Sequence, residues 1–109
     1  MNGLDTKLTE VARQYDDLQS ELARPETSTN PDSLRRLGKE MARLEPVVAA
    51  FRRLEATRSE LSGARELRDA DADEDLRAMA RDEVERLSTD EVRLLEELRV
   101  LLIPRDPND

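Results

Sequence analysis

The sequence predicts an all-α protein, an elongated three-helix bundle from which a two-helix coiled-coil hairpin projects. Three observations favour helices throughout. Apolar residues, mostly leucine, recur in steps of three and four along most of the chain, which places them on one face of a helix. Aromatic residues make up only 2% of the 109 residues, whereas Leu, Ala, Glu and Arg are abundant. Clusters of proline and turn-forming residues divide the apolar stripes into separate segments.

The first helix is expected over residues 3–23. Proline ends it at Pro25, because this residue lacks an N–H group and its ring clashes with the preceding turn. Residues 25–31, with the sequence PETSTNP, are turn-formers and are expected to be a loop. The apolar stripe of the first helix has heptad-type spacing and consists of Leu4, Leu8, Val11, Tyr15, Leu18 and Leu22.

The second helix is expected over residues 32–69, with Asp32 as its N-cap. Its apolar stripe keeps the same phase on both sides of Pro46. We therefore expect a continuous helix that is kinked at this proline and loses one backbone hydrogen bond, at a cost of about 3 kcal/mol. The stripe consists of Leu34, Leu37, Met41, Leu44, Val48, Phe51 and Leu54, and then becomes sparser, with Arg58 lying before Leu61 and Leu67.

The third helix is expected over residues 75–103, after an acidic connector. A break near Ser88 is an alternative, because residues 88–91 resemble a capping box. Charge pairs four residues apart favour a continuous helix, by about 0.3 kcal/mol each. The stripe consists of Leu76, Met79, Val84, Leu87, Leu94, Leu98 and Leu101. Residues 104–109 contain two prolines and are expected to begin a linker to a downstream domain.

The unequal helix lengths suggest how the three helices pack. At 1.5 Å per residue the first helix spans roughly 30 Å and the other two approach about 45–55 Å. The first helix can therefore cover only part of the other two, and residues 52–90 would project as the hairpin. The apolar stripe could instead drive self-association into a coiled-coil adaptor or dimerisation module. We favour a monomer, because loops of about seven residues let the three segments cover one another.

Composition excludes most enzymatic chemistry. The chain has no histidine, no cysteine and a single tyrosine, so the usual bases and nucleophiles are missing, and we expect neither catalysis nor a cofactor. The net charge of -8 opposes binding to nucleic acid and to anionic lipid. No apolar run is long enough to span a bilayer, and no signal-like segment follows Met1, so a cytoplasmic location is expected.

The acidic connector is the one candidate site. Its alternating aspartates match the first half of a calcium-binding loop, but Glu74 replaces the glycine that such a loop needs and Ala80 replaces its bidentate glutamate. A solvated turn is the favoured interpretation, and no metal is expected. Such a turn is also suited to docking a basic protein partner. The candidate docking residues are Asp69, Asp71, Asp73, Glu74 and Asp75.

Five segments together resemble the N-terminal domain of bacterial class-I peptide chain release factors. They are Tyr15-Asp16-Asp17-Leu18, Arg24-Pro25-Glu26, Gly38-Lys39-Glu40, Leu44-Glu45-Pro46-Val47-Val48, and the ending Leu101-Leu102-Ile103-Pro104-Arg105-Asp106-Pro107-Asn108-Asp109. The ending resembles the type that acts at UAA and UAG codons. The resemblance covers nearly the whole chain, and residues 55–75 contribute little to it.

The resemblance implies a part in translation termination on the ribosome. In the family, a tripeptide motif reads the stop codon and a Gly-Gly-Gln loop promotes hydrolysis of peptidyl-tRNA. Neither element occurs within this sequence. The implied role is that of a non-catalytic helical element that lies near the stalk-base proteins of the large subunit and the GTPase that recycles the factor.

Overall fold

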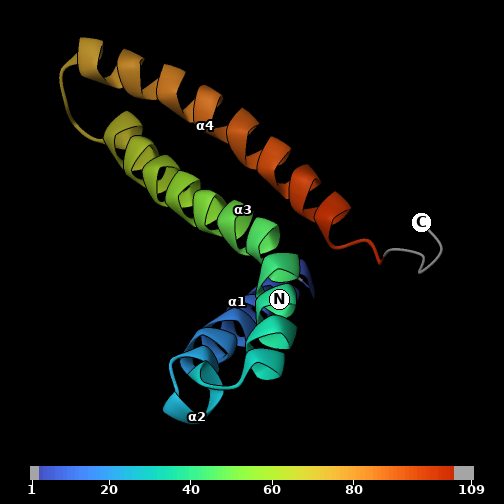
Figure 1. Cartoon of the computed structure of the whole chain (residues 1–109). Coiled ribbons are helices and arrows are strands. Elements are labelled where there is room, and N and C mark those ends of the chain that lie inside the picture. Colours follow the sequence, from blue (N-terminus) through green and yellow to red (C-terminus); the bar gives the residue numbers. More distant parts are fainter. Residues whose placement is uncertain (1–2, 105–109) are drawn as a thin grey trace. The chain divides into compact units, whose positions relative to one another are not determined.

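The computed structural model describes residues 3–104, which form four helices (Figure 1). These are α1 (Gly3–Leu22), α2 (Pro25–Ser28), α3 (Pro31–Asp69) and α4 (Glu74–Leu101). No β-strand occurs within the described residues, so the predicted all-α class is confirmed. The chain divides into two compact units, Met1–Ala49 and Ala50–Asp109, and α3 contributes residues to both.

The first unit contains α1, α2 and the beginning of α3. Two buried side chains of α1, Leu8 and Val11, belong to the predicted apolar stripe. The buried apolar side chains that α3 contributes to this unit are Leu37, Leu44, Val47 and Val48. Polar contacts also join the helices of this unit. Thr27 of α2 is buried and donates its hydroxyl to Glu21 Oε1 of α1 at 3.4 Å.

The prediction of a loop over residues 25–31 is wrong for its first half, because Pro25–Ser28 forms the short helix α2. Proline is favoured at the first position of a helix, where the missing N–H group would have no partner in any case. The preceding Arg24 is extended, with φ -72° and ψ 135°, as an N-cap residue should be. The Thr29 N–H group donates to the Pro25 carbonyl at 3.2 Å and closes this short helix.

The N-cap of α3 is Asn30, and the prediction of Asp32 is wrong. Asn30 Oδ1 accepts hydrogen bonds from the backbone N–H groups of Asp32 at 3.1 Å and Ser33 at 3.2 Å. Pro31 occupies the first helical position, as Pro25 does in α2. The helix continues through Pro46, so the predicted continuity is confirmed.

The second unit is an antiparallel hairpin of the later part of α3 and the whole of α4, joined by residues 70–73 (Figure 1). Helix α4 is continuous through Ser88, as the favoured interpretation predicted. The Thr89 hydroxyl does not cap a new helix but donates to the Glu85 carbonyl one turn earlier, at 3.1 Å. The buried side chains of this unit are Ala50, Leu54, Leu61, Ala80, Leu87 and Leu98.

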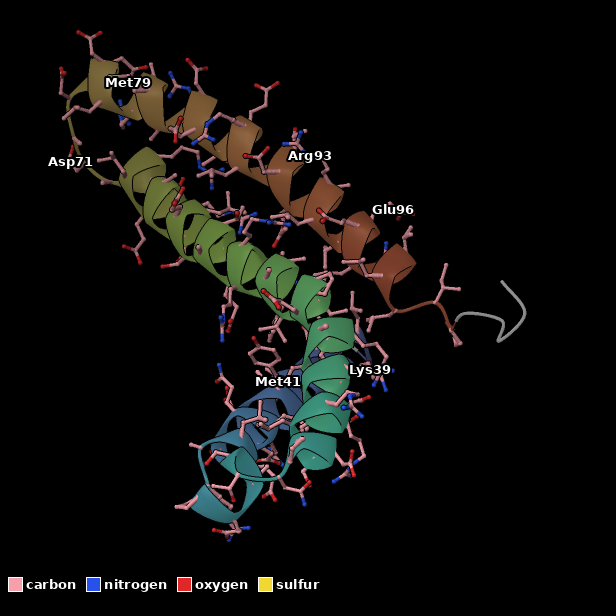
Figure 2. The ribbon with its side chains drawn as sticks, in the orientation of Figure 1. Lys39, Met41, Asp71, Met79, Arg93 and Glu96 are labelled. Atoms are coloured by element: carbon pink, nitrogen blue, oxygen red, sulfur yellow. The ribbon has the colours of Figure 1, made fainter. Side chains whose placement is uncertain are left out.

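The predicted stripe of α4 is wrong at its start. Leu76 is 46% exposed and Met79 is 65% exposed, whereas the neighbouring Ala80 is buried (Figure 2 labels Met79). Ala80 is the residue that continues the stripe backwards from Leu87 in steps of three and four. The longer apolar side chains nearby concealed the phase, because alanine is a weak hydrophobic signal in a sequence.

One polar pair interrupts the apolar stripes of the hairpin. Arg58 of α3 and Glu91 of α4 both occupy stripe positions, and Arg58 Nε lies 3.0 Å from Glu91 Oε2. Their side chains are 34% and 25% exposed. This ion pair explains why the apolar stripe is interrupted at a place where α3 and α4 nevertheless pack together. The three-helix base would combine helices from both units and stays a prediction.

Among residues 3–104, none of the helices carries an apolar stretch long enough to cross a membrane.

Candidate docking surfaces

The acidic turn, residues 69–75, lies where α3 gives way to α4. Asp69 is the last residue of α3, and Asp71 and Asp73 lie in the connector (Figure 2 labels Asp71). Glu74 and Asp75 form the first turn of α4, where their negative charge is favourable near the helix N-terminus. All five acidic side chains are exposed, so the structure presents together the residues that the sequence singled out.

Arginines neutralise two of these five carboxylates. Arg68 Nε lies 2.9 Å from Asp69 Oδ1, and this hydrogen bond lowers the pKa of Asp69. Glu74 accepts hydrogen bonds from Arg77 at 2.7 Å and from Arg81 at 2.8 Å. The hydrogen bond from Arg81 is the main cause that lowers the pKa of Glu74, and the charge of Arg77 adds to it. Both acids therefore lose their charge at a lower pH than they would without these arginines.

Sequence reasoning missed these three arginines. The spacing of Glu74 and Arg77, three residues apart on one helix, was a signal that could have identified one pair. The other two pairs join adjacent residues or residues seven apart, and depend on side-chain conformations that no periodicity specifies.

Three aspartates of the acidic turn make no ion pair within residues 3–104: Asp71, Asp73 and Asp75. Their carboxylates are free to accept hydrogen bonds from a cationic partner. They do not form a calcium-binding cluster, because no three Asp, Glu, His or Cys side chains within the described part of the chain gather into a group that could hold a metal ion. The chemistry that the acidic turn offers is thus the recognition of positive charge at a solvent-exposed site.

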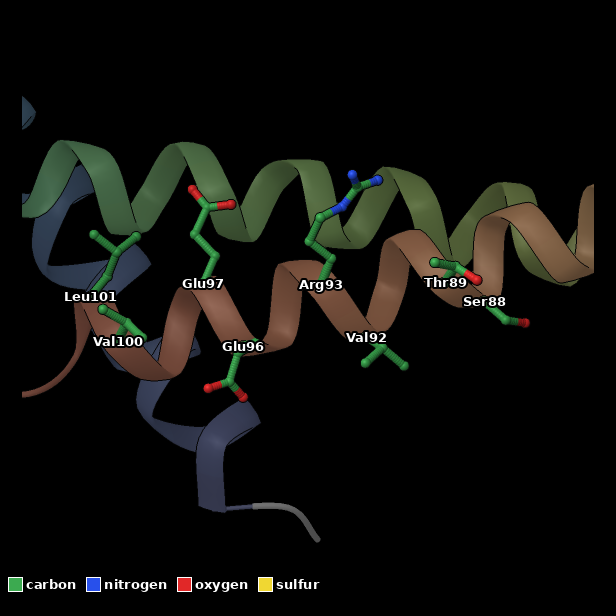
Figure 3. A pocket seen from close by; sticks show the side chains of 8 residues that line it. All are labelled: Ser88, Thr89, Val92, Arg93, Glu96, Glu97, Val100 and Leu101. Carbon is green, nitrogen blue, oxygen red and sulfur yellow. The ribbon is translucent and has the colours of Figure 1, made fainter.

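A second surface lies on α4 and was not identified from the sequence. It is a shallow groove, here called the α4 groove, lined by Ser88, Thr89, Val92, Arg93, Glu96, Glu97, Val100 and Leu101 (Figure 3). Val92 is 66% exposed and Val100 is 59% exposed. Both valines lie off the predicted apolar stripe, which is the signal that could have revealed them.

Ion pairs hold the charged side chains at the rim of the α4 groove. Arg93 pairs with Asp90 on the same helix. Glu97 Oε1 accepts from Arg53 Nη2 of α3 at 3.1 Å. Glu96 lies between the two valines, and its Oε2 is 3.5 Å from Nη1 of Arg99. The groove therefore combines exposed apolar side chains with a central carboxylate.

Comparison of the sequence with known protein families identifies the family of this chain. The model of the PCRF domain matches residues 11–109. The chain belongs to the PCRF domain family. The match includes most of α1 and the whole of α2, α3 and α4, so the acidic turn and the α4 groove both lie within the PCRF domain.

Relatives of this PCRF domain chain are named peptide chain release factor 1. Over 103 residues, this chain is 40% identical to the protein from Pelobacter propionicus, 38% identical to that from Symbiobacterium thermophilum and 33% identical to that from Clostridium novyi. Each alignment covers 94% of this chain but only 28% or 29% of the relative. The PCRF domain chain thus spans less than a third of the length of these relatives. No solved structure matches it significantly.

Proposed function

We propose that this chain is a non-catalytic docking element of a peptide chain release factor that acts in translation termination in the cytoplasm. The observation that carries the proposal is the similarity of 94% of the chain to proteins named peptide chain release factor 1. The absence of histidine and cysteine from the sequence supports a role without chemistry of its own. We further propose the type that acts at UAA and UAG codons, on the basis of the ending that runs from Leu101 to Asp109. Residues 105–109 of that ending lie outside the described residues.

The acidic turn is the proposed contact with the ribosome. Its unpaired aspartates, together with the net charge of -8, favour basic proteins over ribosomal RNA, because opposite charges attract and the RNA phosphates are repelled. The proposed partners are the stalk-base proteins of the large subunit, with the GTPase that recycles the factor as a further partner.

Binding to an isolated stalk-base protein tests this proposal. The triple variant Asp71→Asn, Asp73→Asn, Asp75→Asn should bind on the order of tenfold more weakly than the unchanged chain, and the unchanged chain should lose affinity as salt is raised. The chain offers a matched control in the first unit, where Glu10→Gln, Asp16→Asn and Asp17→Asn change the net charge equally at exposed sites. This control should bind nearly as well as the unchanged chain.

Two results would contradict the docking proposal. One is equal weakening by both triple variants, which would mean that only net charge matters. The other is the absence of detectable binding, combined with crosslinks from residues 69–75 that reach only ribosomal RNA.

A further inference from the structure

Three side chains of the α4 groove form a row along one side of the helix. Val92, Glu96 and Val100 are spaced four residues apart, and Figure 3 shows Val92 and Glu96 pointing away from α3. At 1.5 Å per residue, the two valines are separated by about 12 Å along the helix axis. The row therefore presents two apolar contact points with a carboxylate between them.

The two valines are not among the buried side chains of the hairpin. The side chains that α4 buries are Ala80, Leu87 and Leu98, while both valines are more than half exposed. A single exposed valine is ordinary on a protein surface. Two of them at helical spacing, on opposite sides of one charge and within one groove, form a pattern that a partner helix can match.

The central glutamate argues against a second copy of the chain as the occupant. A parallel pair of α4 helices in register places Glu96 opposite Glu96. An antiparallel pair that matches Val92 with Val100 has its symmetry axis at residue 96 and does the same. Like charges directly opposite each other are destabilising, so both arrangements that match the valines are opposed by Glu96.

We propose that the α4 groove binds a basic amphipathic helix of another protein. Such a helix contacts Val92 and Val100 with two apolar side chains eight residues apart, and places a lysine or arginine between them opposite Glu96. Charge complementarity carries this choice, because the carboxylate that opposes self-association attracts a cation. The inference concerns a surface separate from the acidic turn and does not depend on a role in termination.

The present partner of Glu96 does not prevent this contact. Arg99 lies 3.5 Å away, and the two side chains are 68% and 60% exposed. Exposed ion pairs of this kind contribute little to stability, so Glu96 can exchange Arg99 for a cation of the partner.

A charge-swap titration tests the proposal. The probe is a synthetic alanine-rich helical peptide in which a leucine, a lysine and a second leucine are placed four residues apart (the lysine peptide). A second peptide has glutamate in place of the lysine (the glutamate peptide). With the isotope-labelled chain, the lysine peptide should shift the NMR signals of Val92 and Val100. It should bind on the order of tenfold more tightly than the glutamate peptide. The Glu96→Lys variant should reverse this preference.

A matched pair of variants separates the groove from general surface hydrophobicity. The double variant Val92→Ser, Val100→Ser should lose binding of the lysine peptide. The control, Leu76→Ser with Met79→Ser, removes two other exposed apolar side chains of α4 and should keep it. The proposal is overturned if the unchanged chain and the Glu96→Lys variant show the same preference between the two peptides. It is overturned as well if the control variant loses binding of the lysine peptide as fully as the double valine variant does. It is also overturned if the chain self-associates through the two valines.

Discussion

At the scale of single residues, the pair Arg58 and Glu91 is the most informative feature of the hairpin. Both residues occupy positions at which the stripes call for apolar side chains, and the pair is only partly exposed. Removing a half-buried charge from water costs free energy that the mutual attraction only partly offsets. We therefore expect the pair to contribute more to the register of α3 against α4 than to their net stability, as polar residues in coiled coils do.

A double-mutant cycle tests this interpretation. Glu91→Leu alone removes the ion pair that Arg58 makes with Glu91 at 3.0 Å, and we expect the free energy of unfolding to fall by about 1–2 kcal/mol. Arg58→Leu combined with Glu91→Leu should restore most of that loss, since two apolar side chains then meet in the stripe. Urea unfolding of the unchanged chain, both single variants and the double variant gives the coupling energy. Strictly additive losses would mean that the two side chains do not interact.

At the scale of the helices, caps distinguish the start of α3 from the start of α4. Asn30 accepts two backbone hydrogen bonds at the first turn of α3, whereas Asp73 precedes α4 without a side-chain cap bond. We expect Asn30→Ala to lower the free energy of unfolding by about 1 kcal/mol. Asp73→Ala is the matched control and should cost less, because only its favourable charge near the helix N-terminus is lost. Thermal unfolding of both variants measures the difference, and equal losses would contradict the assignment of the cap.

The sequence predicts the helices better than their ends. Continuity through Pro46 followed from the unbroken phase of the stripe, and the structure confirms it. The short helix at Pro25–Ser28 could not be inferred, because proline both ends one helix and starts the next, and the pattern does not say which. Asn30 was missed for a related reason, since Pro31 makes Asn30 the cap and Asp32 the second helical residue.

At the scale of the whole molecule, the two candidate surfaces differ in how visible they are in the sequence. The acidic turn was evident because five acids within seven residues, without a base among them, mark a solvated segment. Its reduction to three unpaired aspartates could be foreseen only in part, from the spacing of Glu74 and Arg77, because the rest depends on how Arg68 and Arg81 fold back. The α4 groove escaped notice because an apolar stripe identifies the buried side of a helix, and the exposed Val92 and Val100 lie off that stripe.

The oligomeric state of the whole chain is expected to depend on one residue of α4, Glu96. We expect light scattering to give the mass of one chain from micromolar to millimolar concentrations, because Glu96 opposes the pairing of exposed α4 faces. Glu96→Leu removes that charge and joins the two valines into one apolar row, so its mass should rise with concentration. Glu96→Gln is the matched control, which removes the charge without adding apolar surface, and should show a much smaller rise. A tight dimer of the unchanged chain would instead favour a coiled-coil dimerisation module, and the docking role would then need the paired chain.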